Sequence, residues 1–149
     1  MTGILTPDQI NNIVSSQSVC RIACTDGKDP YICPVVYTFD GKHIIFQSKP
    51  GKKINYLRKN PSVCAEIDII NNLNNWKSVL VFGTFEELKS KEADEARKYL
   101  FNKAPTLMTT SSVHPFEHSD NLPSVNDSNR IKKIMCRINI KEMTGRYEM

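Results

Sequence analysis

The residues whose types and spacing best suit chemistry lie together between Ser48 and Lys53. A glycine at position 51 and Pro61 bound a predicted helix over 51–60, so Lys52 and Lys53 fall in its first turn. Backbone N–H groups are unpaired there and the helix dipole is positive, which disfavours two cations. A bound anion would remove this conflict. The stretch therefore predicts a phosphate site formed by Ser48, Lys52 and Lys53.

The same stretch has two other interpretations. Residues 49–59 contain five cations and no acidic residue, which is also typical of a solvent-exposed helix face. A basic helix can also bind nucleic acid, but these cations do not alternate with aromatic residues on a strand, as single-strand binding requires. The net charge of +4 is mild and compatible with phosphate-bearing small molecules. We therefore expect no nucleic acid partner.

The composition is that of one globular domain over residues 1–149, with 40% hydrophobic and 24% charged residues. The first residues lack the basic and apolar regions of a signal peptide, and no apolar run approaches the ~18 residues of a membrane span. The five cysteines are an odd number without a Cys-x-x-Cys pair, so disulfides and structural zinc are not expected. We expect a cytoplasmic protein with reduced thiols, no membrane association and no metal.

The elements that must position the lysines follow from hydrophobic patterns and turn signals. Thr6-Pro7-Asp8-Gln9 is a capping box that predicts a helix to about Ser16. Asp40-Gly41 predicts a hairpin, and Ser90 caps a helix to about Lys103. Six strands are predicted, at 19–25, 31–39, 43–48, 62–68, 77–83 and 130–144.

The connections between these strands decide the fold class. Residues 69–75 are predicted to form a polar loop, and 77–83 a strand buried on both faces. Residues 106–129 show no periodicity and are predicted to form a long irregular excursion. Because short turns join most of the other strands, we predict a mainly β fold, an antiparallel β-barrel with three peripheral helices.

Several short motifs, in this order, resemble one family. They are Cys33-Pro34-Val35-Val36-Tyr37, Phe46-Gln47-Ser48 followed by Gly51-Lys52-Lys53, Asn60-Pro61, Trp76-Lys77-Ser78-Val79 leading to Gly83, and Met143-Thr144-Gly145-Arg146. Together they resemble the FMN-binding split β-barrel superfamily, the pyridoxamine 5′-phosphate oxidase-like proteins. The resemblance covers residues 19–146 apart from the excursion. It implies a six-stranded antiparallel split β-barrel of the FMN-binding type.

The resemblance also implies a cofactor, a partner and site residues. It implies a homodimer with FMN at the interface, and an FMN phosphate held by Ser48, Lys52 and Lys53. The strands before this site would lie along the flavin ring or ribityl chain, and the next motif would meet the ring edge. The residues along the ring or ribityl chain would be Val35, Val36, Tyr37, Phe46 and Gln47. The residues at the ring edge would be Trp76 and Ser78. For Tyr37 and Phe46, ordinary core packing is the alternative.

The differences from the family narrow the expected activity. The chain lacks the Arg-Leu-His-Asp-Arg-type segment with which pyridoxamine phosphate oxidases bind substrate, so oxidation of vitamin B6 is not expected. The chain is most similar to the branch that contains nitroimidazole-resistance proteins, many of which have His where this chain has Gln47. Glutamine cannot act as an acid near neutral pH, so no catalytic side chain is assigned.

We therefore predict a flavoprotein oxidoreductase in which FMN passes electrons from NAD(P)H to a small acceptor, with nitroaromatics as candidates. The alternative is a carrier or sensor on the same fold that binds flavin or haem without turnover. His43, His114 and His118 are the candidate haem ligands in that alternative.

Overall fold

The computed structural model of the protein describes residues 1–103 and 133–149. The predicted excursion at 106–129, with His114 and His118, lies outside the described residues. The elements in chain order are β1 (Thr2–Ile4), α1 (Pro7–Ser16), β2 (Val19–Thr25), β3 (Pro30–Phe39), β4 (His43–Ser48), α2 (Lys52–Lys59), β5 (Ser62–Asn72), β6 (Asn75–Glu87), α3 (Ser90–Lys103) and β7 (Ile134–Glu148).

The strands form one antiparallel sheet that closes on itself. The order is β1-β7-β4-β3-β2-β5-β6, and β6 also pairs with β7. At its beginning β7 pairs with β4 on one side, Ser48 opposite Ile134, and with β6 on the other, Glu87 opposite Cys136. The short strand β1 pairs with the end of β7. The prediction of a six-stranded antiparallel barrel with three helices is confirmed, with β1 as an additional strand that the sequence did not reveal.

Helix α1 begins as its capping box predicts. The Thr6 N–H donates to Gln9 Oε1 at 2.8 Å, and the Gln9 N–H donates to Thr6 Oγ1 at 3.3 Å. These reciprocal bonds satisfy donors that no helical carbonyl can reach. The apolar residues Ile10, Ile13 and Val14 are buried, so the helix covers the barrel with one face.

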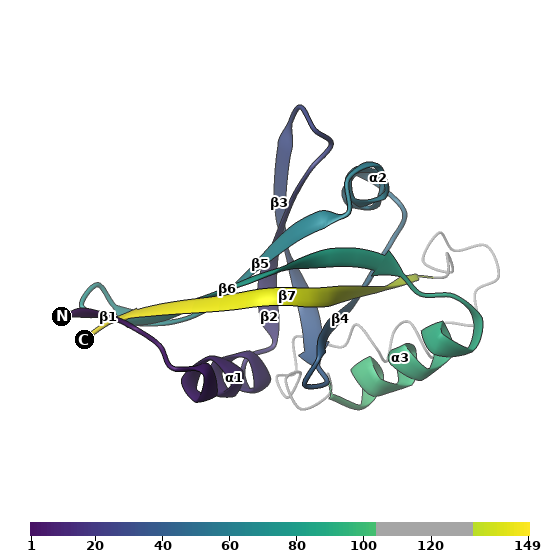
Figure 1. Cartoon of the computed structure of the whole chain (residues 1–149). Coiled ribbons are helices and arrows are strands. Elements are labelled where there is room, and N and C mark those ends of the chain that lie inside the picture. Colours follow the sequence, from purple (N-terminus) through teal and green to yellow (C-terminus); the bar gives the residue numbers. More distant parts are fainter. Residues whose placement is uncertain (104–132) are drawn as a thin grey trace, which may run out of the picture.

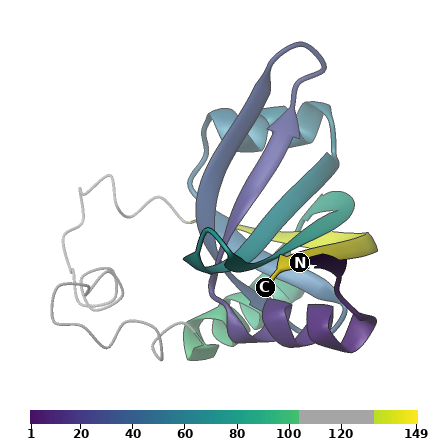
Figure 2. The ribbon, with the colours of Figure 1, turned by 90° about the vertical axis from the view of Figure 1, so that its left-hand side faces the viewer.

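The main core fills the barrel interior. It contains the inward-facing residues of all six barrel strands, and Ile22, Phe46 and Ile138 are fully buried within it. A second, smaller cluster lies where α3 packs on β4 and β7. Figures 1 and 2 show α2 at one end of the barrel and α1 and α3 at the other. No helix within residues 1–103 and 133–149 is long and apolar enough to cross a membrane.

Two predictions about the region 69–83 were wrong. Residues 69–75 are not a loop, because β5 continues to Asn72, β6 begins at Asn75, and Asn72 Oδ1 accepts the Asn74 N–H in the turn between them. The run 77–83 is not buried on both faces either. It alternates, with Val81 inside and Phe82 37% exposed, as an antiparallel strand with one outer face requires.

Candidate functional site

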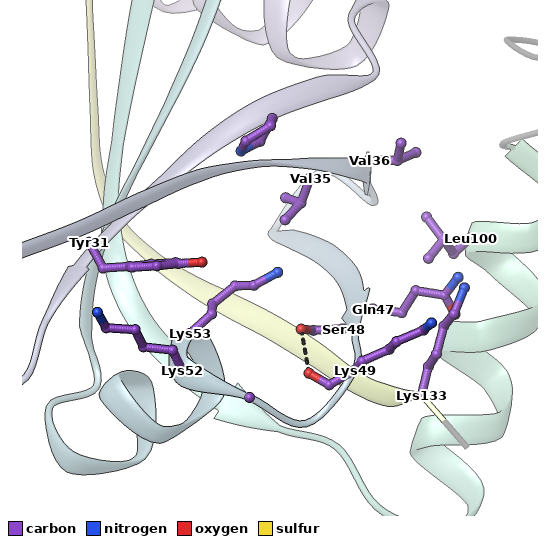
Figure 3. A pocket seen from close by; sticks show the side chains of 12 residues that line it. Tyr31, Val35, Val36, Gln47, Ser48, Lys49, Lys52, Lys53, Leu100 and Lys133 are labelled. Carbon is purple, nitrogen blue, oxygen red and sulfur yellow. Dashed lines mark hydrogen bonds between the residues drawn. The ribbon is translucent and has the colours of Figure 1, made fainter. Parts of the chain in front are cut away.

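A concave site lies beside β3 and β4, between the beginning of α2 and the end of α3 (Figure 3). Its volume is about 520 Å³. The described residues that line it include four lysines and no carboxylate. They are Tyr31, Pro34, Val35, Val36, Gln47, Ser48, Lys49, Gly51, Lys52, Lys53, Leu100 and Lys133. The pocket wall therefore combines apolar β3 side chains with a positive field.

The first end of the pocket is formed by the N-terminus of α2. Gly51 precedes the helix in an extended conformation, with φ 164°, and gives it no side-chain cap. The first helical bond runs from the Asn55 N–H to the Gly51 carbonyl at 3.0 Å, so the N–H groups before Asn55 lack helical acceptors. The first turn holds no acidic residue. The predicted conflict of charges at this helix end is therefore present in the structure.

The two lysines at this end have different surroundings. The Lys52 ammonium lies 5.8 Å from the ring centroid of Tyr31 and 5.5 Å from that of Tyr56, so aromatic faces already attract its charge. The two rings pack edge to face with centroids 5.8 Å apart. Lys53 is half-buried and is directed toward Val35 (Figure 3). Of the two, Lys53 is the better placed to contact a ligand in the pocket.

Ser48 and Gln47 lie in the middle of the pocket at the end of β4. Ser48 is 7% exposed, and its hydroxyl donates to the Lys49 carbonyl at 2.9 Å, which leaves the hydroxyl oxygen able to accept. Gln47 is half-buried. Strand pairing with β7 fixes both residues, because Gln47 lies opposite Met135 and Ser48 opposite Ile134.

The second end of the pocket is formed by α3 and the residue before β7. Leu100 of α3 is 3% exposed and Lys133 is half-buried. Arg97 of α3 donates to the Lys133 carbonyl at 3.4 Å and pairs with Asp94 at 2.9 Å. The helix thus fixes the backbone at Lys133, where the chain enters β7.

The structure brings six of the ten predicted site residues together in this pocket: Val35, Val36, Gln47, Ser48, Lys52 and Lys53. The other four do not line it. Tyr37 and Phe46 lie in the core, at 3% and 0% exposure, and the Tyr37 hydroxyl donates to the Val14 carbonyl at 2.6 Å. Trp76 and Ser78 lie on β6.

Ser78 belongs to a polar cluster on the outer face of the sheet. Its hydroxyl donates to Glu66 Oε2 at 2.7 Å, and Arg21 lies 3.4 Å from carboxylate oxygens of both Glu66 and Asp68. Partial burial raises the pKa of Glu66, and the adjacent Asp68 raises it further, while Ser78 and Arg21 oppose the shift. This cluster and the pocket share no residue.

Six pocket residues were absent from the predicted set: Tyr31, Pro34, Lys49, Gly51, Leu100 and Lys133. Tyr31 could have been predicted, because it lies four residues before Val35 and therefore on the same face of the strand. Leu100 and Lys133 had no such signal, since the packing of α3 and the closure of the barrel bring them to the site.

Cys20, Cys136 and His43, outside the pocket, have structural surroundings. Burial raises the pKa of Cys20 to about 12 and that of Cys136 to about 12, so these thiols stay protonated near neutral pH. The His43 Nδ1 lies 3.0 Å from Asp40 Oδ2 in the turn before β4. Over the described residues, no group of three His, Cys, Asp or Glu side chains is arranged to hold a metal ion.

Comparison with known proteins gives the following matches. The sequence model of a protein family described as pyridoxamine 5′-phosphate oxidase matches residues 6–147. An uncharacterized protein of Rhizobium meliloti (strain 1021) is 26% identical over 147 residues, covering 96% of this chain and 93% of that protein. A FAD-binding protein from Mesorhizobium loti has a similar structure, with a TM-score of 0.79, 25% identity and coverage of 100% and 99% of the two chains. A proposed 5-nitroimidazole antibiotic resistance protein from Bacteroides thetaiotaomicron gives a TM-score of 0.71, 17% identity and coverage of 99% and 87%.

Proposed function

The chain belongs to the pyridoxamine 5′-phosphate oxidase family, and we propose that it binds a flavin, FMN, in the pocket between α2 and α3. The observation that carries the proposal is the first turn of α2, where Lys53 and unpaired N–H groups face a pocket without a lining carboxylate. A phosphate monoester carries about −1.5 to −2 charges and three acceptor oxygens. Lys53 and the helix N-terminus match this group in charge and in donors, and Ser48 adds a donor if its hydroxyl turns from the Lys49 carbonyl to the phosphate.

The rest of the pocket fits the remainder of a flavin. Val35 and Val36 form an apolar wall suited to a ring or ribityl chain, and Gln47 offers an amide that can both donate and accept hydrogen bonds. When bound, the flavin would supply the electron transfer from NAD(P)H to a small acceptor. The side chains named here bind it, orient it and exclude water from one face. A relative of similar structure is described as FAD-binding, which supports a flavin and makes the choice between FMN and FAD a test.

We also propose that the protein is a homodimer that brings the outer face of β6 to the flavin. Val19 on β2, Ile32 on β3 and Leu80 and Phe82 on β6 are 47%, 65%, 37% and 37% exposed. Strand register places them on one face with the Ser78 cluster, since Arg21 lies opposite Glu66, Glu66 opposite Leu80, and Ala23 opposite Ile32. Such an apolar outer face suits a second copy. Trp76 and Ser78 lie on it too, so a dimer would let them meet the ring edge of the partner's flavin.

The test is to titrate the apoprotein with FMN, FAD and riboflavin while following flavin fluorescence. Riboflavin is the matched control, because it lacks only the phosphate. We expect FMN to bind at least about tenfold more tightly than riboflavin, since charge-assisted bonds to phosphate are lost. The bound flavin should then lose its visible absorption when NADPH is added without oxygen. Equal affinity for FMN and riboflavin would exclude the phosphate site, and no binding of any flavin would contradict the function.

A further inference from the structure

The second end of the pocket has a cation that the flavin phosphate does not require. Figure 3 shows Lys133 beside Gln47 and Leu100, across the pocket from Tyr31 and from the first turn of α2. Within the described residues, no carboxylate pairs with the Lys133 ammonium. A half-buried ammonium in a pocket without lining acids is electrostatically unfavourable. An anionic ligand beside Lys133 would therefore be favoured.

The structure also holds Lys133 in place. Its carbonyl accepts from Arg97, and Arg97 is itself fixed by Asp94 of the same helix turn. The next residue, Ile134, begins the paired strand β7. The backbone of Lys133 is therefore held on the C-terminal side of its Cα, by Arg97 and by the pairing of β7. From this position its side chain lies beside Gln47 and Leu100 (Figure 3).

We propose that Lys133, with Gln47, forms a second anion subsite that binds an acidic group distinct from the flavin monophosphate. The inference rests on the proposed flavin site. The group would be a phosphate or carboxylate, because Lys133 supplies a positive charge and the Gln47 amide a further donor. The buried Leu100 at the same end favours an apolar body next to that acidic group. The second phosphate of a dinucleotide flavin is joined to the first through a single oxygen and would stay near α2, so the occupant that fits this end is an acidic substituent on the small acceptor.

The experiment compares the native protein with Lys133→Met and with Lys141→Met as the matched control. Lys141 is an exposed lysine of β7 outside the pocket lining, so its loss removes the same charge from the same strand. Each protein is titrated with FMN and FAD. Each FMN-loaded protein is then titrated with 4-nitrobenzoate and with neutral 4-nitrobenzyl alcohol, while the flavin spectrum is recorded. All four ligands are read out as binding, so the result does not depend on turnover.

The proposal predicts a selective loss in Lys133→Met of about tenfold, the effect of one charge-assisted contact. Weaker FAD binding with unchanged FMN binding would instead place a flavin phosphate at Lys133, and it would contradict both this subsite and the position of the first phosphate at α2. Weaker 4-nitrobenzoate binding with unchanged 4-nitrobenzyl alcohol binding would identify an acidic substrate. Lys133→Arg should preserve whichever affinity Lys133→Met loses, because it retains the charge.

The proposal is overturned if Lys133→Met matches Lys141→Met for all four ligands, or if it weakens charged and neutral ligands equally. Those results leave the flavin site itself intact, so they are distinguishable from a failure of the proposed function. That failure would appear as an absence of flavin binding in the native protein, and it would overturn both proposals.

Discussion

The hydroxyl of Tyr37 donates a hydrogen bond of 2.6 Å to the carbonyl of Val14, joining β3 to the last turn of α1. The last four carbonyls of a helix have no partner within it. Tyr37 therefore satisfies a group that α1 cannot satisfy by itself, and it does so inside the core. The bond explains why Tyr37, two positions after the pocket residue Val35, lies in the core and does not line the pocket.

Tyr37→Phe should destabilise the fold without weakening flavin binding. The substitution keeps the ring but leaves the buried Val14 carbonyl unpaired, at a cost of about 1–3 kcal/mol in the free energy of unfolding. Urea denaturation measures this loss. Tyr99→Phe is the control, because the Tyr99 hydroxyl is exposed and lies 3.5 Å from the Phe39 carbonyl. A loss of FMN affinity in Tyr37→Phe would instead support the flavin contact that the resemblance implied.

The loss of Lys53 should weaken flavin binding more than the loss of Lys52. The Lys53 ammonium faces the pocket, whereas Lys52 lies over the rings of Tyr31 and Tyr56. We expect FMN affinity to fall about tenfold in Lys53→Met and by less in Lys52→Met. Lys59→Met, at the far end of α2, removes the same charge and should change little. The measurement is the FMN dissociation constant of each variant. Equal losses of affinity in all three would show a general effect of net charge and contradict the prediction.

The prediction of the phosphate end shows how far sequence alone can reach. Lys52 and Lys53 were placed at a helix start from Gly51 and Pro61, since helix boundaries and dipoles are local properties. The different roles of the two lysines could not be predicted in the same way. That difference depends on Tyr31, which lies twenty-one residues before Lys52 in the chain and reaches it through strand pairing.

Asp40→Asn should remove a pH-dependent part of the stability. Partial burial opposes ionisation of Asp40, but the His43 ring and the N–H groups of Lys42 and His43 outweigh it and hold its pKa below the usual value. A lowered pKa stabilises the fold above the unfolded value of about 3.9, and that contribution is lost as pH falls through the folded pKa.

For this partly exposed carboxylate we expect Asp40→Asn to cost about 0.5–1 kcal/mol at pH 7, after allowing for solvent screening. The difference from the native protein should shrink as pH falls below the unfolded value of about 3.9 and then through the lowered folded pKa, because the carboxylate becomes protonated in both states. Unfolding in urea at a series of pH values measures it. A difference that stays constant with pH would mean that the charge of Asp40 contributes nothing.

Substitution by alanine should lower the stability of the protein at Gly83 but not at Gly51. A Cβ at Gly83 would run into the Asn139 carbonyl on β7 and lie 2.7 Å from Ile138 Cγ2, where the register of the two strands shifts. Because backbone cannot move aside cheaply, Gly83→Ala should destabilise by about 3 kcal/mol or more. A Cβ at Gly51 meets nothing within 4 Å, so Gly51→Ala should fold normally. Thermal unfolding of both variants checks this; a normal melting temperature for Gly83→Ala would contradict the close approach of β6 and β7.

For the remaining site residues, the sequence reveals what depends on neighbouring residues but not what depends on tertiary packing. Strand alternation identifies Val35 and Tyr37 as sharing a face, but it cannot show that the face passes from the pocket at Val35 to the core at Tyr37. Residues 69–75 were predicted to be a loop because asparagines favour turns. In the structure only the middle of this run forms the turn, and its two ends are paired in β5 and β6. Leu100 and Lys133 are separated in the chain by the undescribed residues, so only the closed barrel brings them together.

The double pairing of β7 has a consequence for how the protein is made. This strand joins β4 on one side and β6 on the other, yet it is the last to be synthesised. Until it leaves the ribosome, the nascent chain holds an open sheet with β4 and β6 as unpaired edges, which are prone to association with other chains. Ser48 of β4 pairs with Ile134, which comes much later in the sequence. We therefore expect the pocket wall at β4 to be completed only when β7 pairs, in the final step of folding.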